Sequence, residues 1–589
     1  MTYQTYKSEI EKYQSKEFQL KQRSNIYLAL KLLMFILTVY FGYLFYNNHS
    51  FINIGLTFLF FASYLTLCVM DNDCRKKIYL LKRLQTVCKN EISYLENNFS
   101  CFNDGNKYMD PEHEFSYDLD LFGKDSLYNR INRTITERGS DKLARKLNIL
   151  SQETQEIKDN QAAIAEIASL SGWRIKFMAN DYISDNFSSF YKLMSNRKPN
   201  PFIHSIIPYI HISLTIIFLI SGVFGIVSWN FFTAIFLINI FTCIIFSKTL
   251  TTTNLDIEKL HKELVLYHEI LKYINTAEFQ SKVLSDLHSK LFTGETNSLK
   301  AFKELSRILN LLDQRGNIII YVILNGIILF DVIILKRISS WNKKYLSNIE
   351  KWMDCIAEYD ALVSLGNYAY NNPNNTYAEI LPDNAADVIQ ATDIYHPFLA
   401  YGKAVPNNFT LSKGNISIVT GANMAGKSTF LRTIGVNYIL ACNGAPVCAK
   451  VFKFSIVSLF SSMRTTDNLS KDISYFNAEL IRLKHLIQHI RTNKSTLIIL
   501  DEILKGTNSK DKLKGSVIFL HEISKYNIAA LIATHDLELA KLEEENDHIY
   551  SNYCFEIELS DNIEYSYKIE RGIAKNLNAS YLLSKMLAD

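Results

Sequence analysis

Two long apolar stretches interrupt an otherwise polar and helix-patterned N-terminal region. Residues 26–46 carry a single charge, Lys31, in 21 positions, and residues 51–70 carry none in 20 positions. A helix rises ~1.5 Å per residue, so about 20 apolar residues cross the ~30 Å hydrocarbon layer of a bilayer. The polar segment 47–50 fits the turn between two such helices. We therefore predict a transmembrane hairpin over these residues.

A second apolar block, residues 201–247, contains 47 positions without Asp, Glu, Lys or Arg. It is long enough for a second transmembrane pair, at about residues 203–226 and 230–247. Basic residues flank both blocks, and the positive-inside rule then places both ends of each hairpin in the cytoplasm. Buried core helices are the alternative interpretation of each pair.

A third apolar run, residues 316–335, contains Asn325 and Asp331. Because a charge at mid-bilayer costs a few kcal/mol, we predict a core helix of the soluble part here rather than a membrane span.

The remaining pattern is helical up to residue 370, and it changes after the Asn/Pro-rich segment 371–375. Short β-rich runs then alternate with helices, which is typical of a parallel α/β sheet. The sequence therefore predicts three regions. These are an N-terminal region with the first hairpin at 1–117, an all-α region carrying the second pair at 118–370, and an α/β domain at 371–589.

Composition narrows the functional classes. Hydrophobic residues make up 48% of the 589 positions and aromatic residues 13%, which excludes a disordered or fibrous chain. The net charge of +4 gives no global nucleic-acid signature, so any DNA contact must come from a local patch. Nine cysteines without a CxxC pair indicate neither a disulfide framework nor a zinc site, and they read as reduced cytosolic thiols.

Residues 421–428 fit the pattern GxxxxGK[ST] in full, between a strand-like run at 416–420 and a helical run at 429–440. That order lets backbone N–H groups close around phosphates at a helix N-terminus. Lys427 is expected to reach the β and γ phosphates, and Ser428 to ligate Mg²⁺. The predicted nucleotide-binding residues are Gly421, Ala422, Asn423, Met424, Ala425, Gly426, Lys427, Ser428 and Thr429.

Further chemistry lies at the ends of two later strand-like runs. An apolar run at 497–500 ends in Asp501 and Glu502, which suit Mg²⁺ coordination and polarisation of the attacking water. The run 528–534 ends at His535, where an imidazole can sense the γ-phosphate. Ser474 precedes a helical run, and by itself it reads as an N-cap. The predicted catalytic residues are Glu502, His535 and Lys427, and the predicted metal ligands are Ser428 and Asp501.

Together these motifs resemble the MutS family of ATPases. The resemblance is carried by residues 420–429, 501–507, 533–535, 474–479, 395–397, 120–123 and 127–139, and it covers about 118–200 and 248–589. It implies an ABC/MutS-type P-loop ATPase domain at the C-terminus, preceded by a helical core and lever region. It also implies a head-to-tail homodimer that hydrolyses ATP to ADP and phosphate with Mg²⁺. Asn423 would lie against the phosphates, and Ser474 would act in trans on the partner's ATP.

The sequence also departs from the family pattern. Ala422 and Ala425 replace the usual Pro and Gly of the loop, and Lys505 replaces the usual Arg of a Gly-Arg-Gly segment. Residues 1–117 contain no Phe-x-Glu wedge of the kind with which mismatch readers enter the duplex. The second apolar pair stands roughly where the family's DNA clamp would be inserted. We therefore expect a membrane-anchored variant without the N-terminal mismatch-recognition domain.

Two functional hypotheses follow. The first is a multi-pass integral protein of the inner membrane whose cytoplasmic ATPase dimer drives a clamp-like cycle on DNA, related to mismatch repair but without expected mismatch specificity. The alternative is a membrane mechanoenzyme or scaffold in which the dimer acts on the hairpins or a protein partner without DNA. A transporter of the ABC type ranks last, because the segment Leu-Ser-Gly-Gly-Gln is absent and four spans are few.

Overall fold

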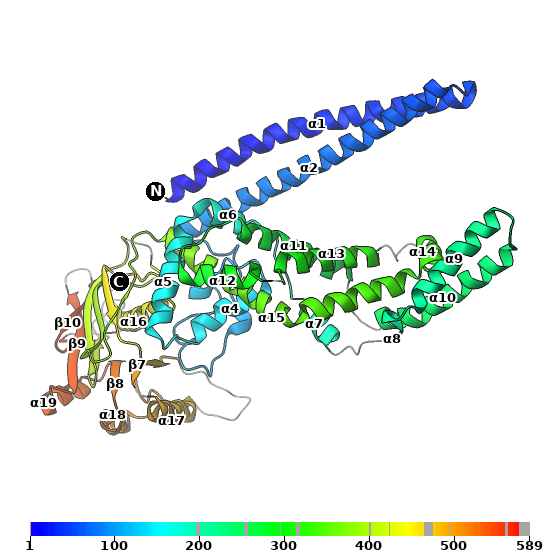
Figure 1. The fold of residues 1–589 in the computed structure, drawn as a ribbon. Coiled ribbons are helices and arrows are strands. Elements are labelled where there is room, and N and C mark those ends of the chain that lie inside the picture. Colours follow the sequence, from blue (N-terminus) through cyan, green and yellow to red (C-terminus); the bar gives the residue numbers. More distant parts are fainter. Residues whose placement is uncertain are drawn as a thin grey trace. The chain divides into compact units, whose positions relative to one another are not determined.

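The computed structural model describes residues 2–185, 187–195, 201–251, 257–294, 296–313, 318–399, 402–422, 424–464, 475–493, 495–559 and 563–575. Contacts divide the chain into two compact units. The first comprises Met1–Arg133, Leu143–Ala179 and Leu362–Asp589, and the second comprises Thr134–Lys142 and Asn180–Ala361. A helical N-terminal region precedes a C-terminal α/β domain, which confirms the coarse fold class (Figure 1). The boundaries predicted at residues 117 and 370 stay predictions.

A six-stranded sheet forms the centre of the first unit, in the order β10-β9-β4-β8-β7-β6. Its strands are parallel except for β10, which pairs antiparallel with β9. β4 and β8 are buried along their whole length, which explains why their sequences are unbroken by charge. The strands are β4 (Ile416–Gly421), β6 (Ser458–Ser462), β7 (Thr496–Asp501), β8 (Ile528–Ala533), β9 (Tyr550–Leu559) and β10 (Ile563–Arg571).

Helices and a second sheet complete the α/β domain. Apolar side chains of α17 (Tyr475–Thr492) and α18 (Ser509–Ile523) pack on β7 and β8 in one hydrophobic cluster, which includes Leu486, Ile498 and Leu520. Helix α16 (Lys427–Cys442) follows β4 directly. The second sheet has the order β1-β5-β2-β3, with β1 (Glu379–Ile380), β2 (Asp387–Ile394), β3 (Asn407–Ser412) and β5 (Val451–Phe454). The domain also contains η4 (Leu537–Lys541) and α19 (Leu542–Glu545).

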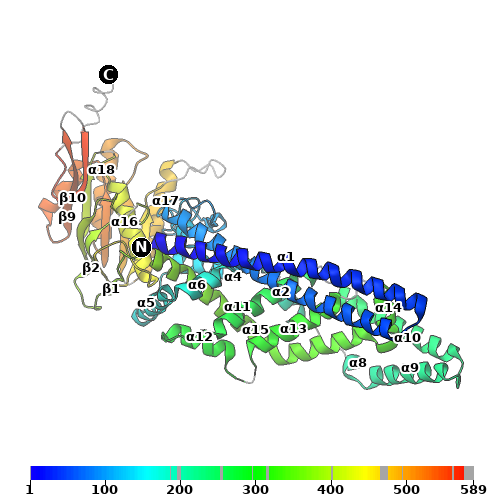
Figure 2. The same ribbon diagram turned by 90° about the horizontal axis from the view of Figure 1, so that it is seen from above.

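Two long helices, α1 (Thr2–Asn48) and α2 (Phe51–Leu95), pair along their length in the first unit (Figures 1 and 2). At one end they pack on α6 (Ser171–Met178) through a cluster that includes Tyr6 and Leu84. Their other halves are apolar and exposed, and both helices are long and apolar enough to cross a membrane. Lys31 is ion-paired with Asp71 at 2.5 Å, which offsets the one charge within the first apolar stretch.

The first unit also contains η1 (Asn106–Tyr108), α3 (Leu127–Ile131) and α5 (Thr154–Ser169), while α4 (Glu137–Asn148) has residues in both units.

The second unit is helical among its described residues. It contains α7 (Phe187–Ser195), α8 (Pro201–His204), α9 (Ile207–Val223), α10 (Trp229–Thr251), α11 (Ile257–Asn275), α12 (Lys282–Phe292), α13 (Ser298–Asp313), α14 (Ile318–Ile328) and most of α15 (Phe330–Asn371). The second predicted hairpin corresponds to α9 and α10, which pack against each other. Their apolar stretches, Ile207–Val223 and Trp229–Ile245, are at the lower limit of the ~17–25 residues of a span, so this pair stays a prediction.

The third apolar run is buried in one half and exposed in the other, so its prediction as a core helix stays a prediction. Ile318 and Ile319 of α14 are 78% and 70% exposed, whereas Asn325, Leu329 and Asp331 are buried. The helix packs against α9 and α10, and a bend of 78° separates it from α15. One of the two polar residues satisfies the backbone at this bend, because the Asn325 side chain accepts the Asp331 N–H at 2.9 Å.

Candidate nucleotide site

The loop between β4 and α16 has the backbone geometry of an anion-binding turn. Gly421 has a φ of 151°, and a Cβ there would lie 2.9 Å from the Phe555 carbonyl oxygen. Gly426 has a φ of 109° and precedes the first turn of α16. Both positions therefore require glycine. The N-terminus of α16, with its unpaired N–H groups and positive dipole end, faces the loop.

Lys427 is 5% exposed and is held against this loop. Its ammonium donates hydrogen bonds to the carbonyl oxygens of Gly421 at 2.7 Å and Ala422 at 2.8 Å. Burial lowers the pKa of Lys427 to about 8, although the nearby carboxylates of Asp501 and Glu502 act in the opposite direction. The side chain is thus a partly desolvated cation directed at the loop.

The two carboxylates come from the end of β7. Asp501 is the last residue of the strand, and Glu502 follows it with a φ of 59° while its N–H still donates to the Ala533 carbonyl of β8 at 2.9 Å. Glu502 Oε1 lies 3.3 Å from His535 Nε2, and its Oε2 lies 3.6 Å from Lys512 Nζ. The left-handed turn therefore directs Glu502 toward the residues that follow β8.

His535 lies between the lysine and the glutamate. Its Nδ1 and Nε2 lie 3.4 Å and 3.5 Å from Lys427 Nζ, and Nε2 also makes the contact with Glu502. Burial, followed by the charge of Lys427, lowers the pKa of His535, and Glu502 opposes that shift. Lys427, His535 and Glu502 form a continuous chain of contacts across the ends of β4, β8 and β7.

The structure brings together most of the residues that the sequence predicted. Lys427, Asp501, Glu502 and His535 meet at adjacent strands, because β4, β8 and β7 are neighbours in the sheet. Ser428 is half-buried in the first turn of α16, and Ala422 and Ala425 are buried in the loop. Exposed residues of the set are Met424 and Thr429. Asn423 and Ser474 lie outside the described residues.

The donor set fits Mg²⁺ by its chemistry. Ser428 and Asp501 offer a hydroxyl and a carboxylate, the hard oxygen ligands that Mg²⁺ prefers. In the described part of the chain no group of three or more His, Cys, Asp or Glu residues could hold a metal ion. This agrees with Mg²⁺ chemistry, since that ion commonly keeps several waters and phosphate oxygens beside one or two protein ligands.

A cavity of 320 Å³ adjoins the loop, and the sequence prediction missed it. Gly426 and Thr429 line it together with the aromatic side chains of Phe430, Phe555 and Tyr567. The last two come from β9 and β10, whose alternating polar and apolar residues gave no sign of a site.

His396 also lines this cavity, and its ring is neutral. Burial, with Arg432 and Arg130 nearby, lowers the pKa of His396 to about 3. Its Nδ1 accepts the Phe398 N–H at 3.1 Å. The motif at 395–397 was the only sequence signal for this wall of the cavity.

Helix α17 contacts the turn that follows the two carboxylates. The buried Glu479 carboxylate accepts the Lys505 N–H at 3.2 Å, and burial raises the pKa of Glu479. Gly506 lies so close to Phe476 that a Cβ at position 506 would be 3.0 Å from the Phe476 Cβ. The start of α17 and the turn at 504–506 are therefore in direct contact.

Comparisons with known proteins agree with this part of the fold. Residues 417–584 match the family model described as MutS domain V. DNA mismatch repair protein MutS of Finegoldia magna is 35% identical over 236 residues, which are 38% of this chain and 27% of that protein. The MutS of Caldicellulosiruptor saccharolyticus is 32% identical over 234 residues, with the same coverage of each chain. MutS protein homolog 4 of Mus musculus is 28% identical over 251 residues, 40% of this chain and 26% of that protein.

The chain spans about a quarter of the length of these curated relatives. Residues 417–584 are therefore similar to MutS domain V, and the matches to MutS proteins support a MutS-like relationship for this part of the chain.

Proposed function

We propose that the α/β domain is a P-loop ATPase that hydrolyses ATP to ADP and phosphate. The observation that carries this proposal is the contact chain of Lys427, His535 and Glu502 at the ends of three neighbouring parallel strands. In open α/β sheets, ligands bind at the carboxyl ends of the strands. A buried lysine, an anion-binding turn and a pair of carboxylates at that edge suit phosphoryl transfer to water.

Each residue has a proposed role. The loop N–H groups and Lys427 bind the phosphates, and Lys427 exchanges its bonds to the loop carbonyls for bonds to phosphate oxygens. Ser428 and Asp501 hold Mg²⁺, which supplies charge neutralisation during phosphoryl transfer. Glu502 orients and polarises the attacking water, and His535 senses the γ-phosphate through its contacts with both neighbours.

The 320 Å³ cavity is proposed to receive the nucleotide base. It adjoins the phosphate loop at Gly426, and its aromatic side chains Phe430, Phe555 and Tyr567 offer stacking surface. His396 is neutral there, and Lys403 contributes a charged side chain to the lining.

The wider assembly is proposed from the family resemblance. It consists of a head-to-tail homodimer in which Ser474 acts on the partner's ATP and Asn423 lies against the phosphates. DNA is the proposed ligand of the dimer, on the ground that the relatives are named DNA mismatch repair proteins. Mismatch specificity is not part of the proposal.

Membrane attachment is proposed from the exposed apolar helices. α1 and α2 cross the bilayer, α9 and α10 form a second, shorter pair, and the α/β domain is cytoplasmic. No residue in the apolar window of α1 or of α2 is buried, which favours this interpretation over buried core helices for that pair. A second candidate function is a membrane mechanoenzyme that works without DNA. The observation that favours this candidate is the shape of α14 and α15. After the bend, α15 continues as one unbroken helix of 42 residues, which suits a lever that transmits movement.

ATPase rates of the full chain in nanodiscs test these proposals. The rate is measured without DNA and with homoduplex, mismatched and single-stranded DNA. Stimulation by DNA that weakens with salt supports a nucleic-acid function. A rate indifferent to every DNA form supports the mechanoenzyme, and no ATPase activity above that of Glu502→Gln contradicts the enzyme assignment.

A further inference from the structure

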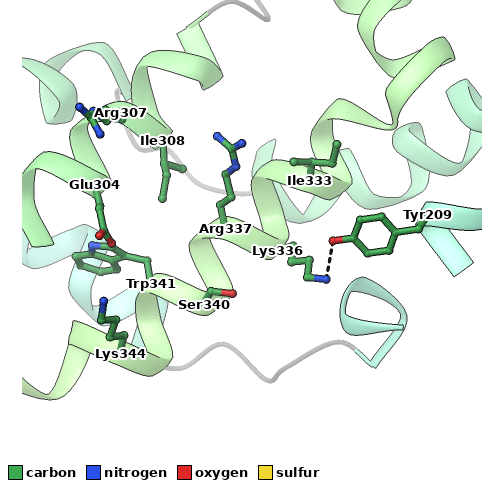
Figure 3. A pocket seen from close by; sticks show the side chains of 10 residues that line it. All are labelled: Tyr209, Glu304, Arg307, Ile308, Ile333, Lys336, Arg337, Ser340, Trp341 and Lys344. Carbon is green, nitrogen blue, oxygen red and sulfur yellow. Dashed lines mark hydrogen bonds between the residues drawn. The ribbon is translucent and has the colours of Figure 1, made fainter. Parts of the chain in front are cut away.

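A second cavity, of 540 Å³, lies within the helical unit and away from the nucleotide site. Its walls come from α13, α15 and the start of α9 (Figure 3). Basic side chains dominate its polar lining, with one carboxylate, Glu304, among them. The basic residues are Arg307, Lys336, Arg337 and Lys344.

Among the residues that the structure describes, the two arginines of this set have no acidic partner, whereas Lys344 lies near the Glu304 carboxylate. Within the described part of the chain, neither Arg307 nor Arg337 forms an ion pair. The Lys336 ammonium donates to the Tyr209 hydroxyl at 2.8 Å, and that partner carries no charge (Figure 3). Four cations against one anion therefore give the cavity a net attraction for negatively charged ligands.

The cavity lies where apolar helix surface changes to charged surface. Lys336 and Arg337 directly follow the apolar start of α15, and Tyr209 stands in the first turn of α9, at the start of its apolar stretch. Tyrosines and basic residues are enriched at this level of membrane proteins, beside the lipid headgroups. Ile308, Ile333 and Trp341 add an apolar wall. The lining thus combines basic side chains that can bind an anion with apolar side chains that can contact hydrocarbon.

We propose that this cavity binds the phosphate headgroup of an anionic phospholipid. The guanidinium groups of Arg307 and Arg337 contact the phosphate, and the apolar wall contacts the glycerol and the upper acyl chain. Basic pockets beside membrane helices on the cytoplasmic side recognise lipid headgroups by this combination of charge and position. The proposal rests on the membrane attachment proposed above and not on the ATPase activity.

The decisive variant is Arg307→Gln/Arg337→Gln, because it removes two exposed cations without touching the hydrogen bond between Lys336 and Tyr209. The matched control is Lys343→Gln/Lys351→Gln, which removes the same charge from exposed positions of α15 outside the cavity. Full-length protein in neutral detergent is titrated with dihexanoyl phosphatidylglycerol, dihexanoyl phosphatidylcholine, inorganic phosphate or duplex DNA, and binding is followed by native mass spectrometry.

We expect phosphatidylglycerol to bind roughly tenfold more tightly than phosphatidylcholine, and the arginine variant to lose this preference while the lysine control keeps it. Equal affinity for both lipids, or equal loss in both variants, overturns the proposal. Phosphate binding as tightly as the lipid identifies a general anion pocket instead. Displacement of the lipid by DNA, lost in the arginine variant, identifies a nucleic-acid contact.

A separate measurement distinguishes failure of the cavity from failure of membrane attachment. Alkaline carbonate extraction of native membranes releases peripheral proteins and retains integral ones. Release of the wild type contradicts the membrane attachment itself. Retention combined with no lipid preference contradicts the cavity proposal alone.

Discussion

Two regions of this protein hold their polar side chains differently. At the candidate nucleotide site these side chains are charged or titratable, and strand ends position them, as with the buried Lys427 and the half-buried Glu502 and His535. Among the described residues of α9, α10 and α14 the buried polar side chains are neutral. There the Asn239 amide donates to the Thr215 hydroxyl at 2.8 Å and to the Gly326 carbonyl at 2.9 Å.

The difference shows what each region is built for. Burying a charged group costs free energy, and titratable groups in such an environment are typical of functional sites. The charged groups at the ends of β4, β7 and β8 fit that pattern. Between apolar helices, neutral hydrogen bonds and close backbone contacts define the packing without a charged group in an apolar layer. Disrupting the first region should therefore change chemistry, and disrupting the second should change stability.

The largest effect is expected from Glu502→Gln. The amide cannot accept the proton of the attacking water, so the ATPase rate should fall about 10²–10⁴-fold while ATP binding persists. Steady-state phosphate release and nucleotide binding check the two halves of this prediction. Glu538→Gln, which alters an exposed ion pair with Lys541, serves as the control. A normal rate in Glu502→Gln would contradict the assigned role.

In the second region, Gly326→Ala tests close helix packing. A Cβ at this position would lie 2.1 Å from the Phe236 ring, so we expect the free energy of unfolding to fall by about 1–3 kcal/mol. Thermal unfolding in detergent measures the loss. The matched control is Gly55→Ala in α2, where nothing lies within 4 Å of the added carbon. Equal stability of the two variants would show that α14 does not pack on α10 as described.

The pH dependence of stability tests burial beside the nucleotide site. The pKa of His396 is lowered to about 3 in the folded protein, below its unfolded value of about 6.5. Its contribution to stability is therefore complete above pH ~6.5 and is lost as pH falls toward ~3, by about 1.4 kcal/mol per pH unit between those values. Chemical unfolding from pH 7 to pH 5 should show this slope, and His396→Gln should lack it. An unchanged slope would place the titration elsewhere.

The smallest effect is expected from Asn239→Leu. The variant loses two donated hydrogen bonds between helices, which together contribute about 1 kcal/mol in a membrane-like environment. Thr242→Val is the control, since that exposed hydroxyl bonds only to the Ile238 carbonyl of its own helix. ATP turnover should be unaffected in both variants, and a loss of turnover in Asn239→Leu alone would break the separation of the two regions.

Much of the nucleotide site could be predicted from sequence because its strands are buried on both faces. Such strands appear as unbroken apolar runs, and the runs at 416–420, 496–500 and 528–534 correspond to β4, β7 and β8. The GxxxxGK[ST] pattern indicated Lys427, and the ends of the two later runs indicated Asp501, Glu502 and His535.

The remaining features depend on contacts between distant segments. Phe555 and Tyr567 line the 320 Å³ cavity together because β9 pairs with β10. Glu479 reaches the turn at 504–506 only because α17 packs there. The hydropathy of the run at 316–335 likewise does not reveal the 78° bend, where the Asn325 side chain accepts the Asp331 N–H.

The contact between α17 and the turn at 504–506 links the position of this helix to the timing of the proposed ATP hydrolysis. With Gly506 against Phe476 and the Lys505 N–H bound to Glu479, the first turn of α17 cannot shift without moving backbone a few residues from Glu502. A displacement of the start of that helix, for example by the partner subunit proposed above, would therefore also move Glu502, the carboxylate proposed to polarise the attacking water. Helix α17 would then permit hydrolysis only when the start of the helix is held in place by the partner subunit.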